Sequence, residues 1–470
     1  MPLFAGDSAK RLRTDLDRIF SDRRFAGARW GIEVFSLDRS EKLYERDTSG
    51  LFVPASNNKL VTAAVALMRL GPDYRYQTRV LTDGPIEAGV LKGNLIIVGS
   101  GDPSCAPQFQ AGDAFAAFRN WAARLREMNV RRIAGDILGD EGAFDSTKFG
   151  LGWEWNDLGQ GYAAPVGALQ FNDNTLSLEI SPGPQKGDPA FLKASPLPGY
   201  LSIENRIVTG AENTPVRVQI RRGPSRKTMV AGGSVPRGGA PVVRTVAVLS
   251  PAHYYLSALR QVLAEGGIDT SECEIKEKEG YAATSLTTLW SHNSPPLSEI
   301  LQPLMKTSQN LYAETLTRTL GLALKGEGTF DKGKEVVEET LAGMGIEKES
   351  YVYADGSGLS RLNLISADAL ARILRHMYRQ PQFPDFYDAL PVAGMDGTLS
   401  ARMKNTRAEN NVHAKTGSIA NVSAISGYVR TMRGEMLAFS ILANNFLVAR
   451  EVVESIQDKA LERLANFSGK

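Results

Sequence analysis

The chain has 470 residues, 43% of them hydrophobic, and its 54 Lys and Arg side chains nearly balance 52 Asp and Glu side chains. A chain of this length exceeds what one hydrophobic core usually serves, so we expect two or more folded domains. The net charge of +2 supplies no strong field for phosphates or anionic lipids, which argues against a nucleic-acid-binding or membrane-surface protein.

Several other classes are also disfavoured. The sequence has no run of about 18 apolar residues, so no membrane-spanning helix is expected. Its first residues lack the apolar core of a secretory signal, which leaves a cytosolic protein and a processed form as alternatives. Cys105 and Cys273 have neither metal-type nor redox-type spacing, and whether they pair is left open. The sequence contains neither a His-Glu-Xaa-Xaa-His nor a Gly-Xaa-Ser-Xaa-Gly motif, which disfavours a zinc hydrolase and an α/β-hydrolase.

The first 84 residues predict two strands and a helix. Residues 28–38 and 41–47 read as strands joined by a tight polar turn. Residues 54–72 read as one apolar helix, closed by Gly71 and Pro72. The first turn of this helix is polar, which is unusual for a helix that is expected to be buried.

The middle of the chain has a different character. Residues 85–285 contain short β-like runs separated by turn-rich segments. Gly and Pro cluster at residues 181–199 and 231–241. We therefore expect an insertion that is itself subdivided.

The C-terminal part predicts helices and then a hairpin. Ser366 is the expected N-cap of one helix. The predicted elements are helices at residues 296–324, 366–379 and 447–467, and strands at residues 421–431 and 435–445. One antiparallel sheet would then take strands from both ends of the chain, flanked by helices, so the predicted fold class is α/β (α+β).

The polar helix start contains Ser56 and Lys59. Residues three apart on a helix lie on one face, with Cβ atoms within about 6 Å, so Lys59 would approach the Ser56 hydroxyl. A buried lysine loses affinity for its proton and becomes a base for a serine nucleophile. The N–H of Ser56 at the helix start would hold an oxyanion. The alternative is an N-cap serine beside a solvated lysine, because Ser-Xaa-Xaa-Lys occurs about once by chance in a chain of this size.

Two further elements follow along the chain. Ser308 and Asn310 form a Ser-Xaa-Asn pattern, and Lys415, Thr416 and Gly417 form the Lys-Thr-Gly sequence that directly precedes a predicted strand. Lys415 would supply a cation and Thr416 a hydroxyl for a substrate carboxylate, while Gly417 lets a ligand lie against the strand edge. Ser308 and Asn310 would relay the leaving-group proton and hold the substrate amide.

The edge of this strand would also bind the substrate backbone. The N–H of Ser418 would complete an oxyanion hole together with that of Ser56.

These three motifs, in this order, are the signature set of penicillin-binding proteins and serine β-lactamases. The large insertion, together with "IIVGSGDPS", "GDILGDEGAFD", "ADGSGLSRLNLIS" and "GMDGTLSARM", resembles the class C low-molecular-mass penicillin-binding proteins, the D-alanyl-D-alanine carboxypeptidases of peptidase family S13. The resemblance covers nearly the whole chain.

The resemblance implies a domain order. A β-lactamase/transpeptidase-like catalytic domain would comprise residues 1–84 and 286–470. Two mostly β domains would be inserted in it, one of residues 85–165 and 243–285 and the other of residues 166–242.

The resemblance also implies a reaction. The family cleaves the terminal D-Ala-D-Ala bond of peptidoglycan peptides, and often a cross-link as a DD-endopeptidase, through an acyl-serine intermediate. β-Lactams mimic the D-Ala-D-Ala dipeptide and acylate the same serine. The implied catalytic residues are Ser56, Lys59, Ser308, Asn310 and Lys415. No metal or organic cofactor is expected. Because peptidoglycan lies outside the cytoplasmic membrane, the implied location is the periplasm or cell wall. The oligomeric state, including a homodimer, is left open.

Similar proteins grip a diaminopimelate side chain with an aromatic and acidic pocket, which "GWEWNDLGQGY" matches. This assigns Asp157 to the ammonium group, Tyr162 with Trp153 or Trp155 to the walls, and Ile419 to an apolar contact. The alternative is that these aromatic residues are core of the insertion. The "DGSGLSR" segment, residues 355–361, is expected to have a structural role.

Two other functions remain alternatives. A serine β-lactamase uses the same acylation apparatus, but the large insertion favours a peptidase. A non-catalytic penicillin sensor or wall-binding protein would normally have an anchor or have lost a motif residue, and the sequence shows neither.

Overall fold

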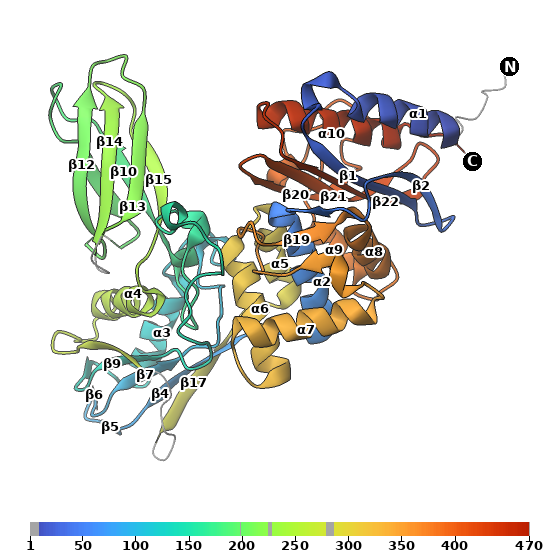
Figure 1. Cartoon of the computed structure of the whole chain (residues 1–470). Coiled ribbons are helices and arrows are strands. Elements are labelled where there is room, and N and C mark those ends of the chain that lie inside the picture. Colours follow the sequence, from blue (N-terminus) through green and yellow to red (C-terminus); the bar gives the residue numbers. More distant parts are fainter. Residues whose placement is uncertain (1–8, 198, 224–227, 279–285, 470) are drawn as a thin grey trace.

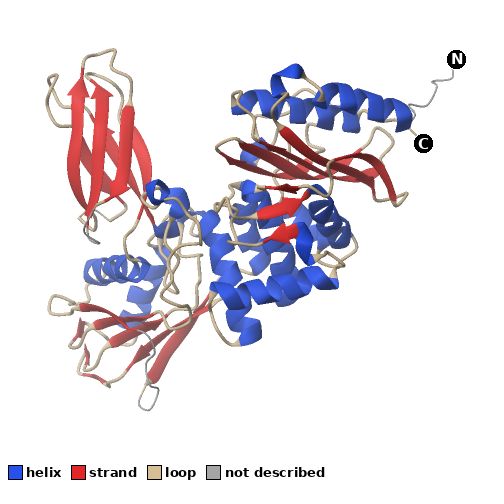
Figure 2. Cartoon of the chain, viewed as in Figure 1, coloured by secondary structure: helices blue, strands red, loops and turns tan. Residues whose placement is uncertain are grey.

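The computed structural model describes residues 9–197, 199–223, 228–278 and 286–469. The two ends of the chain meet in one part of the molecule, and the middle of the chain forms a second part beside it (Figure 1). Figure 2 shows that helices gather next to the terminal sheet, whereas strands dominate the projecting region built by the middle of the chain.

A five-stranded antiparallel sheet, in the order β2-β1-β22-β21-β20, joins the ends of the chain. Its strands are β1 (Arg29–Ser36), β2 (Glu41–Arg46), β20 (His413–Ile419), β21 (Val422–Arg430) and β22 (Met436–Asn444). The hairpin and the two N-terminal strands that the sequence predicts are confirmed. β20 lies at an edge of the sheet. The N–H of Ala414 near its start donates to the carbonyl oxygen of Pro391 at 2.9 Å, and the edge beyond Ala414 borders the cavity described below, where a ligand could bind.

Helices cover both faces of this sheet. Because side chains alternate along a strand, Leu437 and Phe439 of β22 face one apolar core while Ala438 and Leu442 face another. The covering helices are α1 (Ala9–Phe20) and α10 (Arg450–Ala465) on the first face, and α2 (Asn58–Leu70) and α8 (Ala367–Tyr378) on the second. Ser366 caps α8 by accepting a hydrogen bond from the N–H of Ala369 at 3.1 Å, as predicted.

A helical layer surrounds α2, whose residues are buried from Asn58 to Leu67. The other helices of this layer are α5 (Leu297–Lys306), α6 (Asn310–Lys325), α7 (Phe330–Gly343) and α9 (Phe383–Ala389). A small sheet of β3 (Leu51–Phe52), β18 (Tyr351–Val352) and β19 (Leu364–Ser366) lies next to them.

Two predicted helices differ from the structure. The helix predicted over 54–72 begins as a 3₁₀ turn, Ala55–Asn57, before α2. The helix predicted over 296–324 breaks between α5 and α6, because Ser308 has a left-handed φ of 63° that a helix does not accommodate.

The middle of the chain builds a second mixed sheet, in the order β16-β9-β7-β4-β17. Its strands are β4 (Gln77–Thr82), β7 (Leu95–Val98), β9 (Ile137–Asp140), β16 (Ile275–Lys278) and β17 (Thr287–Asn293). Next to it lie α3 (Ala116–Glu127), α4 (Pro251–Glu265) and the short strands β5 (Ile86–Glu87), β6 (Val90–Leu91) and β8 (Arg132–Ile133).

The strand pairing bears on the domain boundaries expected at residues 84/85 and 285/286. β4 and β17 lie outside the expected insertion, yet β4 pairs with β7 of the insertion and β17 pairs with β4. We therefore propose that the insertion begins with β4 and ends with β17.

Two three-stranded sheets pack face to face in the projecting part (Figure 1). One, in the order β11-β10-β15, contains β10 (Thr175–Ser181), β11 (Phe191–Ser195) and β15 (Val242–Ala247). The other, in the order β12-β14-β13, contains β12 (Ser202–Gly210), β13 (Arg217–Arg222) and β14 (Thr228–Pro236). We call this pair of sheets the sandwich.

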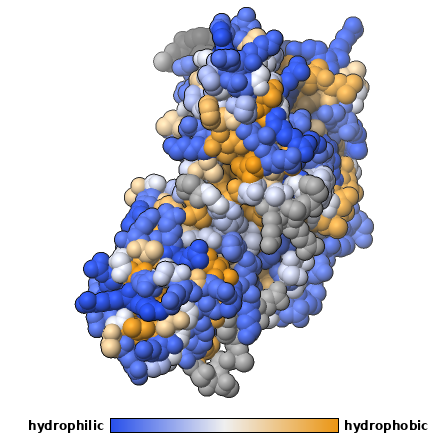
Figure 3. All heavy atoms as spheres, turned by 90° about the vertical axis from the view of Figure 1, so that its left-hand side faces the viewer, coloured by the Kyte–Doolittle hydropathy of each residue, from blue (hydrophilic) through white to orange (hydrophobic). Residues whose placement is uncertain are grey.

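Three further observations concern the described residues. Cys105 and Cys273 are both buried and both free. None of the described helices is long and apolar enough to cross a membrane. Figure 3, which views the molecule from the side of the insertion, shows a mainly hydrophilic face on which hydrophobic residues form separate patches.

Candidate active site

Ser56 lies in a tight 3₁₀ turn against the edge of the terminal sheet. Its neighbour Ala55 has a left-handed φ of 47°, a conformation that costs about 1 kcal/mol for a residue with a side chain. The surrounding structure holds the turn in place. Asn57 Nδ2 donates to Ser426 Oγ at 2.8 Å, and the N–H of Val53 donates to Asn444 Oδ1 at 2.8 Å. These contacts fix the nucleophile candidate relative to β21 and β22.

Lys59 is fully buried and projects from the first turn of α2 toward Ser56. Its Nζ lies 2.9 Å from Ser56 Oγ, 2.6 Å from Asn310 Oδ1 and 2.7 Å from the carbonyl oxygen of Ser357. Burial lowers the pKa of Lys59 to about 7, although the nearby carboxylates oppose this shift. A substantial fraction of this amine is therefore neutral near pH 7 and able to accept a proton.

Ser308 and Asn310 flank the break between α5 and α6. Asn310 Oδ1 faces Lys59, and its Nδ2 donates to the carbonyl oxygen of Tyr162 at 2.8 Å. Asn310 thus links the helical layer to the insertion. The left-handed Ser308 turns its side chain toward β20, where Lys415 Nζ lies 2.9 Å from Ser308 Oγ.

β20 forms the opposite wall of the site. Lys415 is fully buried, and burial together with the charge of Lys59 lowers its pKa well below the usual value. Thr416 Oγ1 lies 2.6 Å from Thr398 Oγ1. A Cβ on Gly417 would lie 2.6 Å from the carbonyl oxygen of Pro54 and 2.8 Å from the N of Ser56. Only glycine lets the strand approach the serine this closely.

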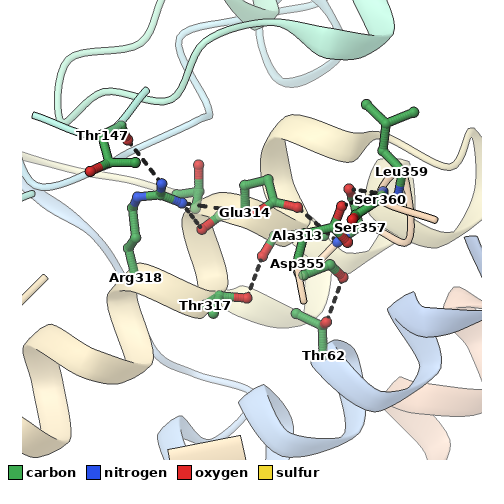
Figure 4. A network of polar contacts seen from close by, with 12 residues as sticks. Thr62, Thr147, Ala313, Glu314, Thr317, Arg318, Asp355, Ser357, Leu359 and Ser360 are labelled. Atoms are coloured by element: carbon green, nitrogen blue, oxygen red, sulfur yellow. Dashed lines mark hydrogen bonds and ion pairs between the residues drawn. The ribbon is translucent and has the colours of Figure 1, made fainter. Parts of the chain in front are cut away.

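A network of buried charged residues lies next to the loop that contacts Lys59 (Figure 4). Glu314 of α6 accepts the N–H of Ser357 at 2.9 Å, and Ser357 is the residue whose carbonyl oxygen contacts Lys59. Arg318, only 1% exposed, lies 3.8 Å from Glu314 and 3.7 Å from Asp145. Burial raises the pKa of Glu314 to about 7; Asp355 also raises it, and Arg318 opposes the shift.

A second buried carboxylate organises the same loop. Asp355 accepts the N–H groups of Gly358 and Ser360, each at 2.6 Å, and Nδ2 of Asn363 at 2.8 Å. Trp153 Nε1 donates to it at 2.9 Å. The structural role expected for residues 355–361 is consistent with these contacts, but Leu359 and Arg361 of this loop also line the cavity described next.

A cavity of about 520 Å³ opens over Ser56. Among the residues assigned from the sequence, it is lined by Ser56, Asp157, Tyr162, Ser308, Asn310, Thr416, Gly417, Ser418 and Ile419. A larger hollow of about 900 Å³ lies beside α4 and contains none of these residues. We place the candidate active site in the smaller cavity because the polar groups of all three motifs converge there.

Only some of the residues assigned to a diaminopimelate side chain line the cavity. Tyr162 OH donates to Asp157 Oδ1 at 2.7 Å, and both line the cavity together with Ile419. Burial and this hydrogen bond raise the pKa of Tyr162 above its usual value. Neither tryptophan lines the cavity. Trp153 is held by Asp355, and Trp155 is 66% exposed.

Other residues at the site were not assigned from the sequence. Thr398 contacts Thr416, and Arg361 Nη2 donates to the carbonyl oxygen of Ala420 at 2.5 Å. Arg361 Nε also lies 3.6 Å from Glu154. The available signals were the segments "GMDGTLSARM" and "DGSGLSR", which contain Thr398 and Arg361. Nothing in the local sequence marks Glu314, because its role depends on a contact with Ser357, 43 residues away.

The arrangement has the parts of a nucleophilic hydrolase. A hydroxyl lies beside a buried amine of lowered pKa, and a second hydroxyl lies beside a second buried amine. The open strand edge of β20 is positioned to bind an extended chain. Within the described residues, no group of three or more His, Cys, Asp or Glu side chains is arranged to hold a metal ion.

Comparison with known proteins identifies the family. The model of the D-Ala-D-Ala carboxypeptidase 3 (S13) family matches residues 12–467. The chain belongs to this family. A D-alanyl-D-alanine carboxypeptidase from Actinomadura sp. (strain R39) is 36% identical, with 99% of this chain and 86% of that protein covered. The resemblance inferred from the motifs is thereby confirmed.

Other S13 relatives extend the comparison. A penicillin-sensitive carboxypeptidase A from Dictyostelium discoideum is 29% identical over 94% of this chain and 88% of that protein. The crystal structure of penicillin binding protein 4 (dacB) from Haemophilus influenzae matches with a TM-score of 0.82 and 25% identity, covering 96% of this chain and 97% of that chain. The predicted fold class is confirmed by this match.

Proposed function

We propose that this protein is a serine-type D-alanyl-D-alanine carboxypeptidase acting through an acyl-serine intermediate. The observation that carries the proposal is the 2.9 Å approach of Nζ of buried Lys59 to Oγ of Ser56, which lines the cavity walled by β20. The named relatives in the S13 family have the same activity in their descriptions.

In the first half-reaction, neutral Lys59 accepts the hydroxyl proton of Ser56. Ser56 Oγ then attacks the carbonyl carbon of the penultimate D-Ala, and the N–H groups of Ser56 and Ser418 stabilise the oxyanion. The C–N bond breaks, and the proton that Lys59 took from Ser56 passes through Ser308 to the leaving D-Ala amine, which returns Lys59 to its neutral form. Lys415 supports this step because its Nζ lies 2.9 Å from Ser308 Oγ.

In the second half-reaction, water attacks the acyl-serine ester. Lys59 accepts the proton of this water, and Ser56 regains its own when the ester breaks. The carboxylate of the terminal D-Ala would bind at Lys415 and Thr416, in the cavity lined by Thr398.

Asp157 and Tyr162 would receive the side chain of the stem peptide. A carboxylate in a partly enclosed cavity suits the ammonium group of a diaminopimelate residue, and Ile419 supplies an apolar contact. We propose no such contact for Trp153 or Trp155.

DD-endopeptidase activity is proposed for the same site. A further hollow of about 300 Å³ adjoins Ser308 and Asn310 and shares Tyr162 with the main cavity. Because Ser308 is assigned to the leaving amine, this hollow offers room for a leaving group larger than a single D-Ala. We further propose peptidoglycan peptides as substrates, β-lactams as acylating inhibitors, and a periplasmic or cell-wall location.

The direct test is release of D-alanine from a peptide that ends in D-Ala-D-Ala. The wild-type protein should release it, and Ser56→Ala, with an unchanged circular dichroism spectrum, should not. Release at an equal rate by Ser56→Ala would refute the assigned nucleophile. A wild-type protein that spares the peptide but rapidly turns over a β-lactam would instead be a β-lactamase.

A further inference from the structure

Positive charge is concentrated in one segment of the chain. Between residues 202 and 244 the sequence has eight Lys and Arg residues against two Asp and Glu residues, whereas the whole chain has a net charge of only +2. The remainder of the chain is therefore net negative. The basic segment forms β12, β13 and β14 and reaches into β15 of the sandwich. A charge confined to one small domain creates a local potential that the overall balance conceals.

Three arginines of this segment share one face of a sheet. Ile207 and Ile220 point into the sandwich core, so their neighbours Arg206 and Arg221 point outward, together with Arg217. All three arginines are exposed. These three and Arg244 of β15 line a hollow of about 560 Å³.

A glycine opens the floor of this hollow. Gly232 lies in the central strand β14, where it pairs with Arg206 of β12 on one side and Gln219 of β13 on the other. A Cβ built on Gly232 meets nothing within 4 Å, so the space above the strand is open. A ligand can thus lie against the strand backbone between flanking polar side chains.

Two of these arginines differ from Arg206 in their ion pairing. Neither Arg217 nor Arg221 forms an ion pair with any residue in the described part of the chain, while Arg206 lies 2.5 Å from Glu204. Arg222, on the inner side of the same strand, behaves differently. Its Nε and Nη2 donate to two backbone carbonyl oxygens, at 2.9 and 2.8 Å.

The arginine-lined hollow and the hollow beside Ser308 both include a residue of β15. Arg244 lines the hollow, and the next residue, Thr245, lines the 300 Å³ hollow beside Ser308. That hollow in turn shares Tyr162, Ser308 and Asn310 with the catalytic cavity. Because successive side chains of a strand point to opposite faces, Arg244 and Thr245 face different sides of β15, and the arginine-lined hollow is a site separate from the catalytic cavity.

We propose that this arginine-lined hollow binds a linear anionic polymer, one that carries carboxylate or phosphate groups at intervals along its chain. Arg217 and Arg221 are four residues apart on one strand, which separates them by about 13 Å. Such a spacing suits repeated charges better than one small anion. The planar guanidinium group pairs with either carboxylate or phosphate through two parallel hydrogen bonds.

Binding to the full-length protein tests the proposal, with poly-glutamate and inorganic polyphosphate as the two probes. Arg217→Gln/Arg221→Gln should weaken binding about tenfold or more and make it less dependent on salt. The matched control is Arg126→Gln/Arg237→Gln, which removes the same charge from exposed positions outside the hollow. The control should retain most of the affinity.

The outcomes separate the possible ligands. Preference for poly-glutamate assigns a carboxylate polymer, and preference for polyphosphate assigns a phosphate polymer. Failure of both probes to bind the wild-type protein, or equal loss in both double variants, would overturn the proposal. Acylation of Ser56 by a labelled penicillin, measured on the same samples, should be equal in all of them, which separates failure of this site from failure of the proposed enzyme.

Discussion

The buried glutamate Glu314 is connected to Lys59 through a single residue. Ser357 donates its N–H to Glu314 at 2.9 Å (Figure 4). The carbonyl oxygen of Ser357 lies 2.7 Å from Lys59 Nζ. The ionised carboxylate of Glu314 favours the protonated form of Lys59. The pKa of Lys59 and the pKa of Glu314 are both about 7. The two groups should titrate as a coupled pair rather than independently.

Glu314→Gln should make Lys59 a base at lower pH. Loss of the anion lowers the pKa of Lys59, so the acidic limb of the acylation rate should move to lower pH by about 0.5–1 unit. The other charged groups around the pair, Asp355, Arg318 and Lys415, remain in place. The measurement is the pH profile of acylation by a chromogenic cephalosporin, from pH 5 to 9.

Glu33→Gln is the matched control. Glu33 is also fully buried and also faces a cation, Lys42 at 3.1 Å, but its partners lie outside the site. Both variants should lose thermal stability, since each removes a buried carboxylate and leaves the cation only its second partner, Asp145 for Arg318 and Glu45 for Lys42. Only Glu314→Gln should shift the profile, and Glu314→Asp, which retains the charge, should remain near wild type. If the acidic limb of the acylation rate lies at the same pH in folded Glu314→Gln as in the wild type, electrostatic coupling of Glu314 to Lys59 is excluded.

The wild-type pH profile follows from the lowered pKa of Lys59. Only the neutral amine accepts a proton, so acylation should rise with pH and level off above a midpoint of about 7. Lys59→Arg, which stays protonated throughout this range, should reduce acylation by about 10²–10⁴-fold at pH 8. A wild-type rate that is constant from pH 5 to 9 would contradict the assignment of Lys59 as the base.

Gly417→Ala should separate β20 from the serine turn. The added Cβ would lie 2.6 Å from the carbonyl oxygen of Pro54, so the strand must shift, at a cost of about 1–3 kcal/mol in stability. Acylation should fall even where the protein remains folded. Gly343→Ala is the control, because a Cβ there meets nothing within 4 Å. Thermal melting and acylation rates on both variants are the measurements, and normal acylation by Gly417→Ala would disprove the need for close approach.

Asp157→Ala should act on substrate choice rather than on chemistry. Hydrolysis of a peptide containing diaminopimelate should fall more than hydrolysis of a simple thioester, because only the peptide presents an ammonium group to Asp157. Tyr162→Phe removes only the hydroxyl that donates to Asp157 at 2.7 Å and should cause a smaller loss. Equal losses of kcat/KM on both substrates in Asp157→Ala would remove this residue from the specificity pocket.

The sequence predicts the local parts of this site better than its long-range parts. The spacing of Ser56 and Lys59 on one turn predicts their contact, since helical geometry alone determines it. The order of the three motifs identifies the family, and the family resemblance predicts that Ser308 and Lys415 lie in the same site. The break at Ser308 was not predicted, because the apolar period continues across it while the backbone reverses to a left-handed φ.

Contacts between distant segments account for the rest. Thr398 reaches Thr416 from a separate loop, and no local spacing encodes that distance. The aromatic stretch predicts Trp153 or Trp155 as a pocket wall, whereas the indole N–H of Trp153 donates to buried Asp355, 202 residues further along the chain. The sequence shows which polar groups are present, but the fold decides which of them meet.

The most direct test of the central claim is the intact mass of the protein after incubation with benzylpenicillin, followed by peptide mapping. We predict one penicilloyl adduct, located on Ser56, that persists long enough to be isolated, and no adduct on Ser56→Ala. A folded wild-type protein that gains no mass, or an adduct located on another residue, would contradict the account of Ser56 as the nucleophile.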